Sequence, residues 1–183
     1  MKKFIESEEG MVLAFSALTL PVLLLVGIFV LDSGQLYVRQ GQLQHLARQA
    51  ANSGILAFGE VLEVRAATNK ASLCAVDFPP SVCSSTNRFD FLTDTEVQLL
   101  AQSLSTQVTV NNAVQSYSKQ YDPEELLEDE QIEVEFPFET ESLVDEVKIR
   151  VVINDQASGF LVEVLPQVRQ VQVEAQSFLS FNL

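Results

Sequence analysis

Residues 11–31 ("MVLAFSALTLPVLLLVGIFVL") form a run of 21 residues without a charge, and fourteen of them are Leu, Ile, Val or Phe. At the helical rise of about 1.5 Å per residue the run spans about 31 Å, which matches the hydrocarbon thickness of a bilayer. Pro21 lies inside it, where a membrane helix tolerates a kink that would weaken a soluble helix. The run therefore predicts a transmembrane helix in the lipid bilayer, kinked at Pro21.

A cleaved secretory signal fits this run less well. Such signals have an apolar core of about 7–15 residues that ends at a small-x-small site, whereas this run is longer and continues into "VLDSGQLY". Lys2 and Lys3 favour a cytoplasmic N-terminus, although Arg39 and Arg48 on the far side weaken the argument. We expect a single-pass protein of the inner (cytoplasmic) membrane, with a C-terminal domain that is periplasmic or extracellular.

Small residues recur in and beyond the apolar run, and the apolar periodicity beyond it predicts a helix that continues to residue 67. Glycine inside a helix costs about 1 kcal/mol relative to alanine, so its repetition favours close packing against another helix. The alternative is a bend or break near residues 32–34. The candidate packing residues are Gly27, Gly34, Gly41, Ala47, Ala50, Ala51 and Gly54.

The chain divides on this basis into a head or leader (1–10), a transmembrane helix (11–31), a helical extension (32–67) and an extracytoplasmic domain (68–183). The domain begins with a loop over residues 68–92, which contains two prolines and the only two cysteines. Cys74 and Cys83 predict a disulfide if the domain is exported, with two reduced thiols as the alternative. A zinc site lacks ligands, because His45 is the only histidine.

The rest of the domain predicts an α+β fold. Thr93 and Glu96 have the spacing of a capping box and predict a helix that starts there. The stretch 106–112 is compatible with either helix or strand. Alternation of apolar and polar residues then predicts an antiparallel sheet, with the exported part of the long helix packed on one of its faces. The expected strands are 132–139, 146–153, 159–165 and 168–181.

Charge disfavours several classes of function. The net charge is −14, and residues 1–70 are neutral, so the acidic excess lies in residues 71–183 and opposes nucleic-acid binding. Residues 122–146 hold twelve acidic residues and no basic one, but they lack the spacing of a calcium loop and are typical of a solvated acidic face. No catalytic motif surrounds His45, so we expect no enzyme activity, no cofactor and no metal.

The residues from about 8 to 60 resemble the TadE/TadG-like proteins of the Flp (Tad) pilus assembly system. That family has a glycine before an apolar span with an internal proline, then an aspartate-glycine-tyrosine exit and an alanine-rich helix. The matching positions are Gly10, Pro21, Asp32, Gly34, Leu36, Tyr37, Leu43, Gln44, Ala47, Ala50, Ala51 and Gly54.

The resemblance implies a membrane-anchored component of pilus assembly that anchors or primes the pilus, with other Tad/Flp assembly proteins or pilins as partners of the N-terminal helix. Cleavage between Gly10 and Met11 would instead make it a processed minor pilin or pseudopilin. Pilins of this lineage carry a glutamate five residues beyond the cleaved glycine, where this chain has Phe15, so the uncleaved anchor is favoured. A membrane-tethered ligand-binding or sensor domain is the alternative from another class.

Overall fold

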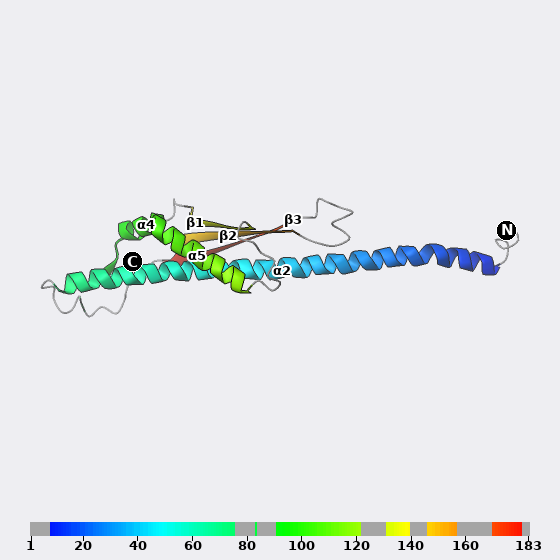
Figure 1. The fold of residues 1–183 in the computed structure, drawn as a ribbon, viewed down its shortest axis with the longest axis horizontal. Coiled ribbons are helices and arrows are strands. Elements are labelled where there is room, and N and C mark those ends of the chain that lie inside the picture. The colour runs from blue at the N-terminus through cyan, green and yellow to red at the C-terminus, as the bar shows by residue number, and fades with distance from the viewer. Residues whose placement is uncertain are drawn as a thin grey trace. The chain divides into compact units, whose positions relative to one another are not determined.

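The computed structural model describes residues 8–75, 83, 91–121, 131–139, 146–156 and 170–180. It confirms the α+β class, with a long N-terminal helix followed by two shorter helices and a three-stranded antiparallel sheet (Figure 1). The chain forms two compact units, one comprising Met1–Gly41 with Gln156–Val171, and the other Gln42–Asp155 with Gln172–Leu183. We call the second unit the folded domain.

Helix α2 (Glu8–Cys74) is 67 residues long and contains Pro21. No break occurs at residues 32–34, where the Ser33 hydroxyl donates a hydrogen bond of 2.7 Å to the carbonyl of Phe29 within the helix. The prediction of a loop starting at residue 68 was wrong, because the helix continues to Cys74. The stretch 68–74 contains neither glycine nor proline, so nothing in its backbone chemistry ends the helix earlier.

The core of the folded domain is built around one stripe of α2. The buried positions recur at three- and four-residue spacing, which places them on one face of the helix. Phe58 packs edge-on against Phe136, with 5.1 Å between the ring centroids, and Asn52 accepts a hydrogen bond of 2.7 Å from Ser177. The expected packing of α2 on a face of the sheet is therefore present. The buried residues of the stripe are Leu43, Leu46, Ala47, Ala50, Ala51, Ile55, Phe58, Leu62 and Ala66.

The sheet has the order β1-β2-β3, formed by β1 (Ile132–Phe138), β2 (Glu146–Gln156) and β3 (Gln170–Ser180). β1 pairs antiparallel with β2, and the register shifts between Glu135 and Phe138, around Pro137. Proline suits an edge strand because it cannot donate to a ladder. The expected strand 159–165 lies outside the described residues.

Central strand β2 shows why the sheet has two different faces. Val147, Ile149, Val151 and Ile153 alternate along it and are fully buried, whereas Lys148, Arg150 and Asn154 point to the other face and are partly exposed. This period-2 pattern is the one that predicted the strand.

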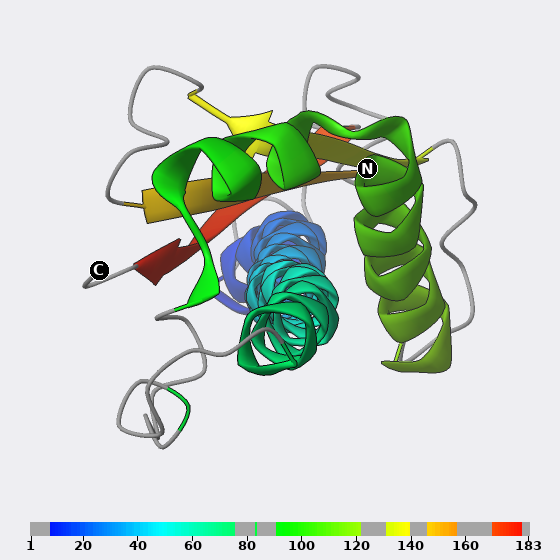
Figure 2. The same cartoon turned by 90° about the vertical axis from the view of Figure 1, so that its left-hand side faces the viewer.

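Helices α4 (Asp94–Gln102) and α5 (Leu104–Tyr121) complete the domain. In Figure 2, which looks nearly along α2, the sheet lies above α2 and α5 lies beside it. The stretch 106–112, left open between helix and strand, is helical in α5, because Thr106, Val110 and Val114 recur every four residues and are buried.

Candidate functional site

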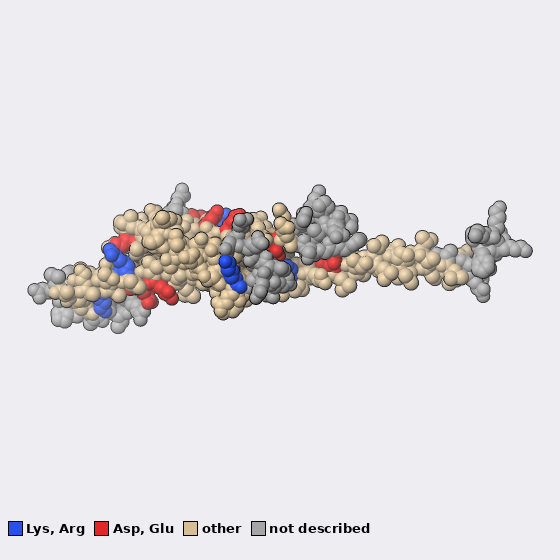
Figure 3. Space-filling view, in the orientation of Figure 1, with Lys and Arg blue, Asp and Glu red and all other residues tan. Residues whose placement is uncertain are grey.

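The apolar part of α2 is exposed along its length in this chain. The large apolar side chains of residues 11–31 have exposed fractions between 41 % (Ile28) and 73 % (Leu18), and α2 is long and apolar enough to cross a membrane. On the face drawn in Figure 3 this part of the helix shows no acidic or basic side chain. Burial in a bilayer would remove this apolar surface from water.

Hydroxyl groups within the apolar run satisfy their hydrogen bonds inside the helix. Ser16 donates to the carbonyl of Val12 at 2.8 Å, and Thr19 donates to the carbonyl of Ser16 at 3.4 Å. A hydroxyl that bonds to its own helix is tolerated in lipid, because no donor is left without an acceptor. The polar residues of the run are therefore compatible with a membrane span.

The small residues of α2 divide into two groups. Ala47, Ala50 and Ala51 are fully buried in the folded domain, and Gly54 is buried as well. In contrast, a Cβ atom built on Gly27, Gly34 or Gly41 would meet no atom of the described chain within 4 Å. The first group is used for packing within the chain, whereas these three glycines remain predicted contacts for another helix.

Gly54 marks the closest approach between α2, α5 and the sheet. A Cβ atom there would lie 2.5 Å from Cδ1 of Ile149 and 2.8 Å from Cγ2 of Val114. Real Cβ atoms do not come this close to other heavy atoms. Only glycine allows α5 and β2 to sit where they do against α2.

Glu96 joins the start of α4 to the far end of α2. Its carboxylate accepts hydrogen bonds from the amide of Asn69 (3.1 and 3.2 Å), from the backbone and hydroxyl of Thr93 (3.2 and 3.3 Å), and from Arg65 (3.2 Å). The reciprocal bond from the backbone of Glu96 to Thr93 completes the predicted capping box. The bond from Asn69 lowers the pKa of Glu96 most; burial opposes this, and Thr93 and Arg65 lower the pKa further.

The same end of α2 carries the predicted disulfide. Cys74, the last residue of α2, is bonded to Cys83, and their Cα atoms are 5.9 Å apart. Beside it, Asn69 donates to the carbonyl of Phe91 at 2.9 Å, and the ammonium of Lys70 lies 5.3 Å from the centre of the Phe91 ring. These contacts fasten the segment before α4 to α2. Asn69 was missed from the sequence, since an amide in a polar helical stretch carries no local signal of its partner.

Ion pairs link the three strands on the outer face of the sheet. Arg150 of β2 bonds to Glu174 of β3 at 2.8 Å and to Glu135 of β1 at 3.2 Å. These two contacts raise the pKa of Arg150, and the contact with Arg150 is the main cause that lowers the pKa of Glu174. Lys148 bonds to Glu146 and Glu139, which raise its pKa in that order. Much of the basic charge of the domain is therefore already paired.

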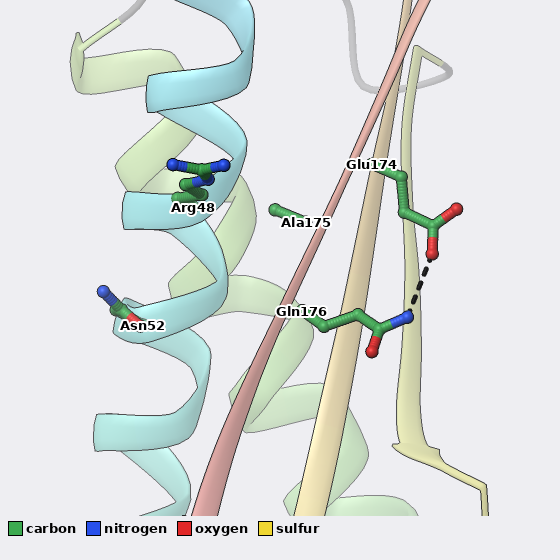
Figure 4. A pocket seen from close by; sticks show the side chains of 5 residues that line it. All are labelled: Arg48, Asn52, Glu174, Ala175 and Gln176. Atoms are coloured by element: carbon green, nitrogen blue, oxygen red, sulfur yellow. Dashed lines mark hydrogen bonds between the residues drawn. The ribbon is translucent and has the colours of Figure 1, made fainter.

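A groove of about 470 Å³ lies between α2 and strand β3. Arg48 and Asn52 line it from α2, one helical turn apart, and Ala175 points into it from β3, whereas Glu174 and Gln176 extend away on the other side of the strand (Figure 4). No local sequence pattern predicts this groove. As a sequence feature Arg48 bears only on membrane orientation, and nothing near it in the chain places it beside residues about 125 positions away.

The described residues contain no group of three or more His, Cys, Asp or Glu side chains that could hold a metal ion. His45 is exposed on α2. Most of the acidic segment 122–146 lies outside the described residues; within it, Glu133, Glu135 and Glu139 bond to side chains of β2.

Comparison with protein families identifies the N-terminal part of the chain. Residues 16–52 match the family model described as TadE-like protein. This segment is TadE-like. The match covers most of the apolar run, from residue 16 on, together with Gly27, Gly34 and Gly41 and the first buried turns of α2. It confirms the resemblance of this segment that was found in the sequence.

No curated protein and no solved structure matches the chain. The family match ends at residue 52, so the strands and helices α4 and α5 lie outside it. The TadE-like segment is thus continuous with a domain that lies largely outside the family match.

Proposed function

We propose that this protein is a non-enzymatic, membrane-anchored component of Flp (Tad) pilus assembly, which anchors or primes the pilus through α2. The observation that carries the proposal is the TadE-like match to residues 16–52, the part of α2 that leaves the apolar run and enters the folded domain. Other Tad/Flp assembly proteins or pilins would contact the helix at Gly27, Gly34 and Gly41. The protein would cross the inner membrane once, with its domain in the periplasm or outside the cell.

Three features support a helix that binds partners rather than a simple tether. The three glycines are spaced by seven residues, so they lie on nearly the same side of the helix. None of them contacts the rest of the described chain. The helix has no break after Asp32, although a tethered sensor domain would favour a flexible break there. The disulfide supports an exported domain, because disulfides persist in oxidising compartments.

Surface piliation of the native host tests this function. Deletion of the gene should abolish surface pili, and the intact chain should restore them. We expect Gly34→Leu to fail, because a leucine side chain would hold a partner helix away. Gly59→Leu is the matched control, since Gly59 also has open space around it but lies in the folded domain. Normal piliation with Gly34→Leu, at a normal amount of protein in the membrane, would refute contact at this glycine; normal piliation after deletion would refute the function.

The intact mass of the protein from its native membrane separates the anchor from a processed minor pilin. Gly10 lies in the first turn of α2, and Met11 follows it. A mass that retains residues 1–10 supports the permanent anchor. A mass that lacks them, with Met11 as the new N-terminus, would mean that the chain is cleaved despite Phe15 and is able to leave the bilayer and enter a filament.

A further inference from the structure

Strand β3 is an edge of the sheet in the described part of the chain, where it pairs with β2 alone. An edge strand presents unpaired backbone N–H and C=O groups, and these bind an additional strand readily. The exposed side chains of β3 occupy alternate positions along the strand. Apart from Glu174 they are uncharged, and one of them, Phe178, is 62 % exposed. In a chain of net charge −14, this edge lacks the run of charges that usually discourages strand addition.

The groove beside this edge carries one basic side chain, that of Arg48. Arg48 is exposed, and within the described residues it makes no hydrogen bond or ion pair. Asn52, one turn away, uses its side-chain oxygen to accept from Ser177, which leaves its amide hydrogens as donors. Glu174 does not neutralise Arg48, because it points to the outer face and bonds to Arg150 and Gln176.

We propose that the groove between α2 and the edge of β3 binds an extended segment of a partner protein that carries a carboxylate side chain. The backbone of the segment adds to β3 as a fourth strand, which is a general mode of peptide recognition. Its carboxylate binds to the guanidinium of Arg48 and the amide of Asn52, which are both donors. The site does not depend on the role proposed for the membrane helix, so either proposal can fail alone.

The charge pattern favours this occupant over a second copy of the chain. Pairing of two β3 edges around Glu174 would bring two copies of this carboxylate together, and like charges opposite each other destabilise a strand pair. It would also leave Arg48 without a carboxylate unless one came from elsewhere. A partner segment with alternating apolar and acidic residues fits both the strand and the donors on α2.

Binding of synthetic peptides to the full chain in detergent tests the proposal. The probe is a fluorescein-labelled peptide with the sequence TVEVTVT, blocked at both ends, and the measurement is fluorescence anisotropy. Two matched peptides separate the contributions: TVQVTVT lacks the carboxylate, and a version of the probe with N-methyl groups on every residue has no backbone N–H donor on either edge and cannot pair as a strand. We expect the probe to bind about fivefold more tightly than the glutamine peptide, the upper range for an exposed ion pair, and the N-methylated peptide not to bind.

Substitution of Arg48 should remove the preference for the acidic peptide. Because Arg48 is exposed and has no bond to another described residue, Arg48→Gln should fold normally and bind both TVEVTVT and TVQVTVT equally, whereas Arg48→Lys should retain most of the preference. Arg65→Gln is the control for loss of a positive charge on the same helix. No binding of the acidic probe, equal binding of the N-methylated peptide, or an unchanged preference in Arg48→Gln would each overturn the proposal. Self-association that the probe does not compete with would favour a second copy instead.

Discussion

Replacement of Gly54 by alanine should destabilise the folded domain, although alanine is the better helix former. The gain in helix propensity is about 1 kcal/mol. Against it stand contacts of 2.5 Å to Ile149 and 2.8 Å to Val114, with Val110 at 3.3 Å. Ile149 can move its terminal methyl group, but a valine in a helix has essentially one rotamer, so Val114 can yield only if α5 moves. Overpacking costs about 1–3 kcal/mol.

Because two of the contacts are well inside van der Waals distance, we expect a cost in the upper half of this range, about 2–3 kcal/mol. Subtraction of the gain in helix propensity gives a net loss of about 1–2 kcal/mol for Gly54→Ala. For a domain of this size each kcal/mol shifts the Tm by roughly 2–4 °C. The measurement is thermal unfolding of the full chain in detergent, followed by circular dichroism. Gly59→Ala is the matched control on the same helix: nothing lies within 4 Å of its Cβ position, so alanine should raise stability by up to about 1 kcal/mol.

A double variant examines the cause of the loss. Ile149→Val removes the atom nearest to the new Cβ and alone costs about 0.5–1.5 kcal/mol. Combined with Gly54→Ala, it should cost less than the sum of the two single effects, because the closest clash is gone. The reasoning is refuted if Gly54→Ala is as stable as the unmodified protein, or if the two substitutions simply add.

Two further predictions concern the far end of α2. Glu96→Gln should lower the free energy of unfolding by about 1–2 kcal/mol at neutral pH, because a glutamine cannot accept all the bonds that converge on this carboxylate. Since the pKa of Glu96 is lowered in the folded chain, its carboxylate stabilises the fold above the ordinary glutamate pKa, and this stabilisation is lost as the pH falls through the lowered value. The difference in Tm between the unmodified protein and Glu96→Gln should therefore shrink on acidification. A difference that stays constant across the pH series would contradict this. Reduction of the disulfide should cost about 2–3 kcal/mol, as the chain-entropy model gives for a sequence separation of 9; a Cys74→Ala/Cys83→Ala variant should be insensitive to the reductant, and an equal Tm shift in that variant would show that the effect lies elsewhere.

Local patterns predicted those elements whose physics is local. The apolar run, the capping box of Thr93 and Glu96, and the alternation along β2 each involve residues within a few positions of one another, and each is present as expected. The end of α2 was placed too early because polar residues and the nearby prolines suggested a loop. Residues 68–74 are held as helix at a position where Asn69 and Lys70 contact Phe91, about twenty residues further along the chain.

The division of the small residues could not be read from the sequence. Gly41 and Gly54 look alike as helical glycines, yet one faces open space and the other faces Ile149, Val114 and Val110. The two glycines differ because α5 and β2 pack against α2 at Gly54 and not at Gly41. These contacts join residues that are about 60 to 100 positions apart in the chain. The groove at Arg48 has the same origin, since β3 comes from the other end of the sequence.

This division also explains how one helix can serve two kinds of contact. Where α2 carries alanines and Gly54, α5 and the sheet already occupy the surface, so a partner helix cannot use it without unfolding the domain. Where it carries Gly27, Gly34 and Gly41, no other described part of the chain competes for the surface. A substitution in the first group should therefore act through stability, and one in the second through assembly. Measurement of both quantities on Gly54→Ala and Gly34→Leu separates the fold of this protein from its proposed function.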